Sequence, residues 1–262
     1  MGESILLIGN SDIKENEDYG SIIDSFDNVT RFNRFETKNY EKYLGTKTTH
    51  YILNKNLYNK GWFEKKLESK NIQRYVISQA EQSRLNQKVS KHIDNITYIL
   101  GEESEPIKEY YGLFEEVMRK AGKTYNKIPS YKPETGILAI LYFLKRYEVV
   151  FLHNFDFGKT SHYYSKKKNG KVIMQEDRPN KKHAWEYSKE LVKYFEKKGR
   201  IQFLNKKGVK NMTDYKKHIT EVSDFPKKGV SFKDISPILS DENKFKQIGN
   251  MWNTLIPVKS SS

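Results

Sequence analysis

The sequence predicts an α/β fold, a mostly parallel sheet with helices on both faces, followed by a short C-terminal appendage. Short, continuous apolar runs recur along the chain, and helix-length stretches separate them. Such runs are typical of buried parallel strands, whose two faces are both covered. Strands that alternate with helices favour a parallel sheet. At 262 residues the chain is long enough for one large domain, or for one domain with an appendage.

The predicted strands follow one another in chain order. The first covers residues 4–8 and runs into the turn Gly9-Asn10-Ser11, and the others cover residues 49–53, 74–78, 96–100, 149–152 and 201–204. Helices are predicted over residues 110–121, 135–147 and 184–198. In an open sheet of this kind, ligands bind at the carboxyl ends of the strands. We therefore expect the binding crevice among the residues that directly follow them.

Two further segments have a distinct pattern. Residues 166–182 are polar, basic and rich in turn residues, which predicts a loop of the kind that often covers a donor site. The pattern changes again after the last predicted strand, so we place a domain boundary near residue 212. The prediction is a main domain over residues 1–211 and a C-terminal segment over residues 212–262.

The composition limits the classes of function. A net charge of +14 fits a basic face for an anionic partner, such as a membrane surface, or merely a lysine-rich solvated surface. The lysines are scattered without the motif of a nucleic-acid reader, so no nucleic acid is expected. The absence of cysteine excludes disulfides and a cysteine nucleophile. No apolar run approaches the ~20 residues of a membrane span and no signal segment is visible, so we expect a cytoplasmic protein, at most peripheral to the membrane.

The turn after the first strand suggests a ligand. Gly9 has no Cβ and can let the backbone approach a bound molecule, and the Asn10 amide can donate and accept hydrogen bonds. The turn lacks the three-glycine fingerprint of dinucleotide-binding folds, so NAD and FAD are disfavoured.

The residues downstream of this turn extend the pattern. Gly20, residues 22–27, residues 29–33 and residues 45–49 follow in an order and spacing that resemble the large sialylmotif of eukaryotic-type sialyltransferases. The resemblance covers residues 5–50 and implies a Rossmann-like, GT-A-like fold variant whose first unit binds the CMP part of a sugar donor. It implies donor contacts for Gly9, Asn10, Ser11 and Asn33. Taken singly, the same glycines and aspartates could be turns and caps.

A second segment, residues 133–140, resembles the small sialylmotif, in which a Thr-Gly turn opens a helix. Thr135 and Gly136 match, and the helix N-terminus offers unpaired N–H groups to an anion or a ribose. Glu134 stands where that family usually has Ser, and Asn154 where it usually has Gly. Residues 155–157, Phe-Asp-Phe, are similar to the Ile-Asp-Phe of bacterial sialyltransferases.

Two histidines complete the resemblance. His162 matches the third sialylmotif, which implies a hydrogen bond to the donor phosphate, and Tyr163 beside it is assigned to the donor site. His183 matches the very short sialylmotif, which implies the general base for the acceptor hydroxyl; imidazole titrates near neutrality and suits that role. Ser188 stands where the family has Glu. A lone histidine at a helix start is otherwise often a cap or a surface residue. We assign structural roles to the remaining histidines: His50, His92, His153 and His218.

Other chemistries are disfavoured. Gly158-Lys159-Thr160 is no phosphate loop, because such a loop needs a glycine at position 153 and the sequence has His153. No Asp-x-Asp pair follows a predicted strand, so no metal ion is expected. No cofactor is implied, since the CMP sugar would be a co-substrate.

The resemblance implies an inverting, metal-independent glycosyltransferase. The donor would be a CMP-activated sugar, sialic acid as first choice and Kdo as second, and the acceptor a hydroxyl of a glycan or glycolipid. A cell-surface glycolipid such as lipooligosaccharide would suit a basic enzyme at the cytoplasmic face of a membrane. The alternative is a non-catalytic nucleotide- or polyanion-binding module with a decayed transferase site.

The C-terminal segment carries a different resemblance. Residues 222–239 are similar to the N-terminal part of adenine phosphoribosyltransferases, over about 40 residues in all. The acidic run and Thr-Gly loop that hold phosphoribosyl pyrophosphate in that family are absent, so no phosphoribosyltransferase activity is expected. The segment is either a truncated fusion or an arm for packing or dimerisation, which leaves a homo-oligomer open.

Overall fold

The computed structural model describes residues 4–13, 18–63, 71–79, 82–85, 96–123, 133–160, 162–164, 184–204, 220–224, 227–228 and 231–240. The chain divides into two compact units, Met1–Phe203 and Leu204–Ser262, and each is described by itself. The predicted boundary near residue 212 falls outside the described residues and stays a prediction.

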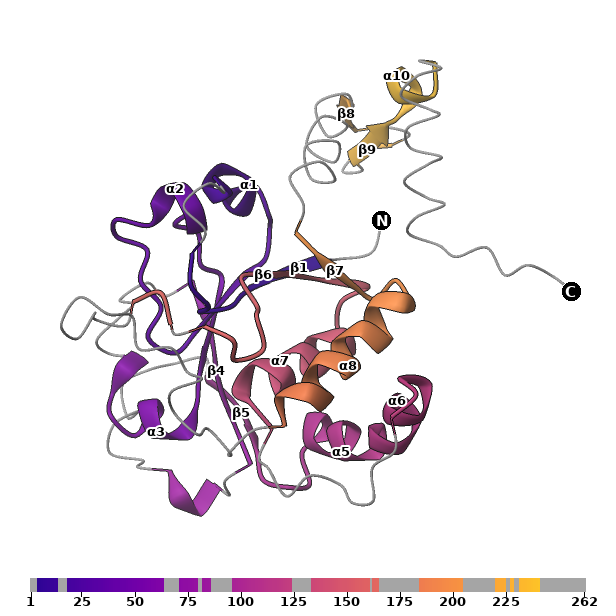
Figure 1. The fold of residues 1–262 in the computed structure, drawn as a ribbon. Coiled ribbons are helices and arrows are strands. Elements are labelled where there is room, and N and C mark those ends of the chain that lie inside the picture. The colour runs from indigo at the N-terminus through magenta and orange to yellow at the C-terminus, as the bar shows by residue number, and fades with distance from the viewer. Residues whose placement is uncertain are drawn as a thin grey trace, which may run out of the picture. The chain divides into compact units, whose positions relative to one another are not determined.

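A seven-stranded parallel sheet forms the centre of the first unit (Figure 1). Its order is β5-β4-β3-β2-β1-β6-β7. From β1, strands β2 to β5 follow in chain order to one edge of the sheet, and β6 and β7 lie on the other side of β1. The strands are β1 (Ser4–Ile8), β2 (Val29–Phe32), β3 (His50–Leu53), β4 (Gln73–Ser78), β5 (Ile96–Leu100), β6 (Val149–His153) and β7 (Ile201–Phe203). The strand order reverses between β1 and β6, and ligands bind at such a switch point in sheets of this type. The predicted fold class is confirmed.

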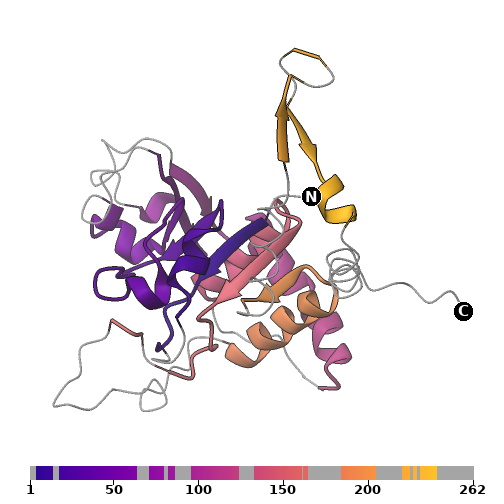
Figure 2. The same cartoon turned by 90° about the horizontal axis from the view of Figure 1, so that it is seen from above.

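Helices lie on both sides of the sheet, and Figure 2 shows the strands between the two groups. The first group comprises α1 (Gly20–Asp24), α2 (Glu41–Leu44) and α3 (Lys55–Tyr58). The second comprises α5 (Glu105–Gly112), α6 (Phe114–Lys120), α7 (Thr135–Leu144) and α8 (Trp185–Lys197). A short 3₁₀ helix, η1 (Gln82–Arg84), follows β4.

The alternation of side chains along β3 shows why its sequence is apolar throughout. Tyr51 and Leu53 pack into a cluster with Leu57 and Tyr58 of α3. Ile52 points the other way, into the larger cluster that contains most of α7. Both faces of the strand are therefore buried, which favours a continuous apolar run over alternation.

Several predicted elements differ in extent. The helix expected over residues 110–121 is two helices, α5 and α6, which meet at Leu113. The helix expected over residues 135–147 ends at Leu144. β2 was not predicted as a strand, because Arg31 interrupts its apolar run, and that arginine is buried.

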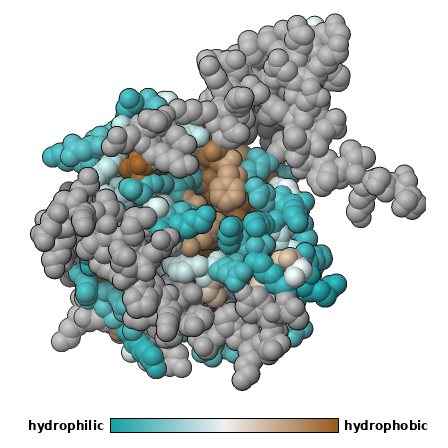
Figure 3. Space-filling model, viewed as in Figure 1, coloured by the Kyte–Doolittle hydropathy of each residue, from teal (hydrophilic) through white to brown (hydrophobic). Residues whose placement is uncertain are grey.

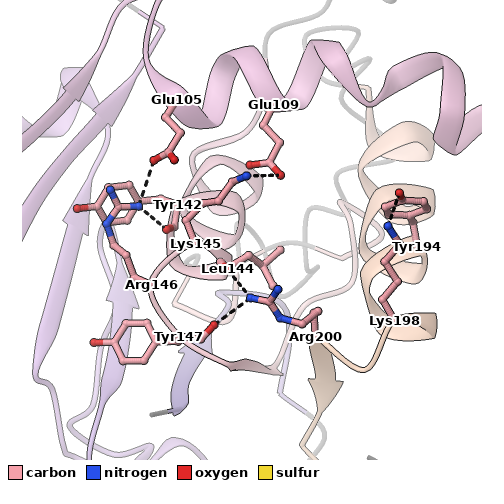
Figure 4. Close-up of polar contacts among 10 residues, drawn as sticks. All are labelled: Glu105, Glu109, Tyr142, Leu144, Lys145, Arg146, Tyr147, Tyr194, Lys198 and Arg200. Carbon is pink, nitrogen blue, oxygen red and sulfur yellow. Dashed lines mark hydrogen bonds and ion pairs between the residues drawn. The ribbon is translucent and has the colours of Figure 1, made fainter. Parts of the chain in front are cut away.

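Polar contacts join α5, the C-terminal end of α7 and the start of β7 (Figure 4). Arg146 lies 3.2 Å from Glu105, and Lys145 lies 3.4 Å from Glu109. The Arg200 guanidinium donates to the carbonyl oxygens of Leu144 and Tyr147. The contact with Leu144 satisfies a carbonyl that the helix leaves unpaired at its C-terminus, and cations there also interact favourably with the helix dipole.

In the second unit, β8 (Thr220–Ser223) and β9 (Ser231–Asp234) form an antiparallel pair, followed by α10 (Ser236–Leu239).

Over the described part of the molecule, the face seen in Figure 3 is mainly polar, with apolar residues visible at a few places. This agrees with a charged fraction of 31%. The search for membrane spans, made over the described residues, finds no helix with the length and apolarity to cross a bilayer.

Candidate active site

A cavity of about 1330 Å³ opens at the carboxyl ends of the strands. Its walls come from the residues that follow β1 to β6 and from the starts of α7 and α8. The crevice therefore lies where the strand pattern predicts it. The predicted donor-site residues that line it are Gly9, Asn10, Ser11, Asn33, Thr135, Gly136 and His162.

The turn after β1 is bound closely to the turn after β6. The Gly9 N–H donates to the His153 carbonyl over 2.8 Å, and the Asn154 side chain donates to the Ser11 carbonyl over 2.7 Å. A Cβ on Gly9 would collide with the Asn154 carbonyl oxygen and crowd the Phe155 ring. Glycine is thus required here by the neighbouring strand end. The sequence pattern predicts Gly9 from the approach of a ligand and gives no sign of this contact.

Asn10 and Asn33 are fixed by backbone groups of adjacent strands. Asn10 Nδ2 donates to the Phe32 carbonyl over 3.0 Å. Asn33 has a positive φ of 53°, a conformation that Asn tolerates better than most residues, and its Oδ1 accepts from the Asn54 N–H over 3.1 Å. Each side chain is held with one end against the backbone, and both residues border the cavity.

A buried arginine and an aspartate support the loop that precedes β3. Asp24 accepts hydrogen bonds from the backbone N–H groups of Thr46 and Lys47, both at 2.8 Å. Arg31 is 1% exposed and donates to the carbonyls of Leu44 and Lys47 and to the Thr48 hydroxyl. Burial lowers the pKa of Arg31 to about 10, which leaves it charged at neutral pH. These residues of the large motif therefore hold the strand-end architecture and do not line the cavity.

His162 lies at the rim of the Asn10 turn. Its Nδ1 lies 3.3 Å from the Asn10 carbonyl oxygen, and the Tyr163 N–H donates to the same oxygen over 3.2 Å. A carbonyl oxygen only accepts, so Nδ1 carries the proton and Nε2 is the ring nitrogen left for other partners. The surrounding protein lowers the pKa of His162 by desolvation, while the Asn10 carbonyl and Asp156 oppose that shift.

Tyr163 was assigned to the donor site, but it lies outside the residues that line the cavity. Its hydroxyl donates to the Glu36 carbonyl over 2.8 Å and lies 2.7 Å from the Glu36 N–H, and its ring packs edge-on against Tyr40. In this structure Tyr163 joins the loop after β6 to the loop after β2. It would act on a ligand through His162 and Asn10, which it positions.

The loop after β6 is organised by a carboxylate. Asp156 accepts from the N–H groups of Gly158 and Thr160 and from the Thr160 hydroxyl. A phosphate loop uses its N–H groups to hold phosphate, whereas two of them here bind a carboxylate, and no helix begins at residues 158–160. The rejection of a phosphate loop therefore agrees with the structure.

Glu134 and Ser188, two of the three positions that depart from the sialylmotifs, lie together. Both are buried, and the Ser188 hydroxyl donates to Glu134 Oε2 over 2.8 Å. Glu134 is the N-cap residue of α7, and Ser188 lies in the first turn of α8. Both line the cavity, so the two departures form one contact in its wall.

Some predictions fall outside the described residues. His183, the predicted base, and the predicted loop over residues 166–182 both lie outside the described residues.

Among the histidines assigned structural roles, His50 is buried and packs between Tyr75 and Phe143, and desolvation lowers its pKa to about 4. Within the described part of the chain, no three His, Asp or Glu side chains gather as a metal site.

Other cavity residues were not predicted. Gln79, Arg84, Glu102 and Glu103 follow β4 and β5 and line the far side of the cavity from α8. Their position after two predicted strands could have identified them, because that position places side chains at the same edge of the sheet. Trp185 also lines the cavity, and its ring packs against Gly158, where a Cβ would collide with it.

Comparison with known proteins gives likenesses to solved structures and short matches to other proteins. The fold is similar to the crystal structure of a mammalian sialyltransferase, with a TM-score of 0.51 and 17% identity over 77% of this chain and 68% of the other. The chain is 42% identical over 48 residues to an adenine phosphoribosyltransferase of Prochlorococcus marinus, and 57% identical over 30 residues to one of Anaeromyxobacter dehalogenans. It spans only 28% and 17% of the lengths of these two relatives.

The family model named "Glycosyltransferase family 29 (sialyltransferase)" matches residues 5–200. These residues contain strands β2 to β6, all of β1 but Ser4, and all of the cavity lining, while β7 follows directly after them. The sialyltransferase resemblance predicted from the sequence is confirmed, and the chain belongs to glycosyltransferase family 29, the sialyltransferases.

Proposed function

We propose that this chain transfers sialic acid from CMP-sialic acid to a hydroxyl group of a glycan or glycolipid. One observation carries the proposal: residues from three separate sialylmotifs, spread along the chain from position 10 to position 162, border one cavity at the strand ends. Asn10 and Asn33 approach it from β1 and β2, Gly136 from the start of α7, and His162 from the loop after β6. Family membership supports the same donor.

The residues suggest how the reaction would proceed. The acceptor oxygen would attack the anomeric carbon of the sugar while the bond from that carbon to the CMP phosphate breaks, and the electron pair would leave with CMP. His183 would take the proton of the acceptor hydroxyl. His162 would donate to the phosphate as its negative charge grows. A single displacement of this kind inverts the configuration at the anomeric carbon.

The start of α7 supports a polar or anionic ligand. No side chain caps this ten-residue helix at its N-terminus, and Thr135, Gly136 and Ile137 line the cavity. The first N–H groups of a helix have no partner within the helix and carry a partial positive charge. These groups suit the ribose or phosphate of CMP.

Two measurements test the proposal. CMP should raise the melting temperature, by mass action on the folded state; no shift would refute the donor site. His183→Ala should lower the transfer rate from CMP-sialic acid by about 100-fold or more. His218→Ala is the control, because His218 lies outside the residues that match the family. A full rate for His183→Ala would refute the assignment of the base.

Three details of the proposed reaction need tests of their own: the sugar transferred, the absence of a metal ion, and action at a membrane surface. CMP-sialic acid and CMP-Kdo are compared in the same assay, and faster turnover of CMP-Kdo would reassign the sugar. We propose transfer without a metal ion, so excess EDTA should leave the rate unchanged. The net charge of +14 supports an anionic membrane surface as a site of action, which sedimentation with vesicles of anionic lipid, compared with neutral vesicles, would test.

A further inference from the structure

The N-terminus of α7 has an unusual neighbour for a site that would receive an anion. Its N-cap residue is Glu134, whose side chain makes no cap hydrogen bond. A carboxylate at this position is a natural partner for the free N–H groups and the positive end of the helix dipole. If it bound them, it would occupy the groups that face the cavity.

The Glu134 carboxylate instead lies against α8. Its Oε2 accepts the Ser188 hydroxyl over 2.8 Å, and Ser188 is 1% exposed. Tyr110 of α5 lies close by: burial raises the pKa of this tyrosine, and the Glu134 carboxylate raises it further. Tyr187, next to Ser188, donates from its hydroxyl to the Tyr110 carbonyl and so fixes the same wall.

We propose that Ser188 is a positioning residue for the donor: its hydroxyl holds the Glu134 carboxylate against α8 and thereby keeps the first N–H groups of α7 open to CMP. This inference rests on the proposed function. A buried carboxylate that loses a hydrogen-bond donor seeks another, and the start of α7 is part of its own segment. Freed from Ser188, the carboxylate would cap α7 and repel the phosphate of the nucleotide.

The test is the affinity for CMP, measured by titration calorimetry on the full chain. Ser188→Ala should weaken CMP binding by about tenfold, the scale of a charge at a helix terminus. Adding Glu134→Gln to Ser188→Ala should restore most of the affinity, because no charge remains to compete. A cavity or a packing defect left by Ser188→Ala would not be repaired by this neutral change. Equal weakness of the single and the double variant would overturn the inference.

A second pair of variants makes the test independent of whether Ser188→Ala folds. Glu134→Asp shortens the side chain by one methylene, so it loses reach to Ser188, and Asp is a favoured N-cap residue. It should therefore weaken CMP binding without lowering the melting temperature. Glu134→Asn, a cap of the same shape without the charge, should bind CMP more tightly than Glu134→Asp.

The outcomes separate the inference from the proposed function. If the unaltered chain does not bind CMP, the proposed function fails and the inference falls with it. If the unaltered chain binds CMP but Glu134→Asp and Glu134→Asn bind it equally well, the inference alone fails.

Discussion

The Ser188 hydroxyl lies 2.8 Å from Glu134 Oε2, and this bond joins the first turn of α8 to the residue that precedes α7. The sialylmotif pattern has a hydroxyl, from Ser, at position 134 and a carboxylate, from Glu, at position 188. This chain has the same two groups at exchanged positions. Because the two groups are in contact, we expect these two departures to compensate each other.

This relationship predicts the behaviour of an exchange variant. Ser188→Glu alone would place two carboxylates together in a buried wall, which should lower the free energy of unfolding by about 3 kcal/mol or more. Combining it with Glu134→Ser restores one carboxylate and one hydroxyl, and should recover most of that loss. Urea unfolding of the single and double variants measures the coupling, expected at about 1–3 kcal/mol. Additive effects of the two substitutions would contradict the compensation.

Gly9 gives a second prediction. Because a Cβ at this position would collide with the Asn154 carbonyl oxygen, Gly9→Ala must separate the ends of β1 and β6. The expected cost is about 2 kcal/mol or more in the free energy of unfolding, with weaker binding of CMP. Gly112→Ala is the matched control, since nothing lies within 4 Å of a Cβ there and the residue is helical. That change should stabilise the chain slightly. Equal effects of the two alanines would show that β1 and β6 can separate without cost.

The sheet could largely be predicted because its inner strands, among them β1, β3, β4 and β6, are buried on both faces. β1, β3, β4, β5, β6 and β7 all give short apolar runs, whereas the apolar run over residues 137–144 is longer and forms most of α7. β2 was missed because of Arg31, a charged side chain in the middle of a buried strand. Helices α1, α2 and α3 have four or five residues each, which is too short for a periodic pattern.

The site could be located but not assembled from the sequence. Motif positions identified Asn10, Asn33 and Gly136 as residues near a common ligand, and the structure places them around one cavity. The roles of Gly9 and Tyr163 depend on contacts with residues over 100 positions away, which no local pattern reveals. The Glu134–Ser188 hydrogen bond also joins residues that are distant in sequence. In the sequence, each of the two residues is only a departure from the family's motif.

Arg31 leads to a third prediction. Its planar guanidinium donates to two carbonyls and a hydroxyl at once from fixed, fork-shaped N–H groups. A lysine ammonium cannot reproduce that fork of donors. Arg31→Lys should lower the free energy of unfolding by about 3 kcal/mol, because buried acceptors lose charge-assisted hydrogen bonds. Arg34→Lys is the control: Arg34 is exposed and lies over the Trp62 ring at 5.1 Å, so its change should cost about 1 kcal/mol or less. A small cost for Arg31→Lys in urea unfolding would mean that the loop before β3 does not depend on the fork.

His162 gives a prediction about pH. Its Nδ1 donates to the Asn10 carbonyl, so Nε2 carries a proton only in the imidazolium form. Desolvation lowers the pKa of His162 in the free protein, and a bound phosphate would raise it. Between these two pKa values, binding must take up a proton, so the affinity for CMP should fall as the pH rises through this window.

The proton uptake can be measured directly. Titration calorimetry at a pH of about 6.5, in buffers of different ionisation enthalpy, gives the number of protons bound with CMP. The phosphate of CMP titrates in the same range, near a pKa of about 6, and contributes its own proton change. His162→Gln keeps that contribution and removes the imidazole, so the difference between the two proteins isolates His162. Equal proton uptake in both would show that the imidazolium does not meet the phosphate, and the assignment of His162 to the leaving group would then be wrong.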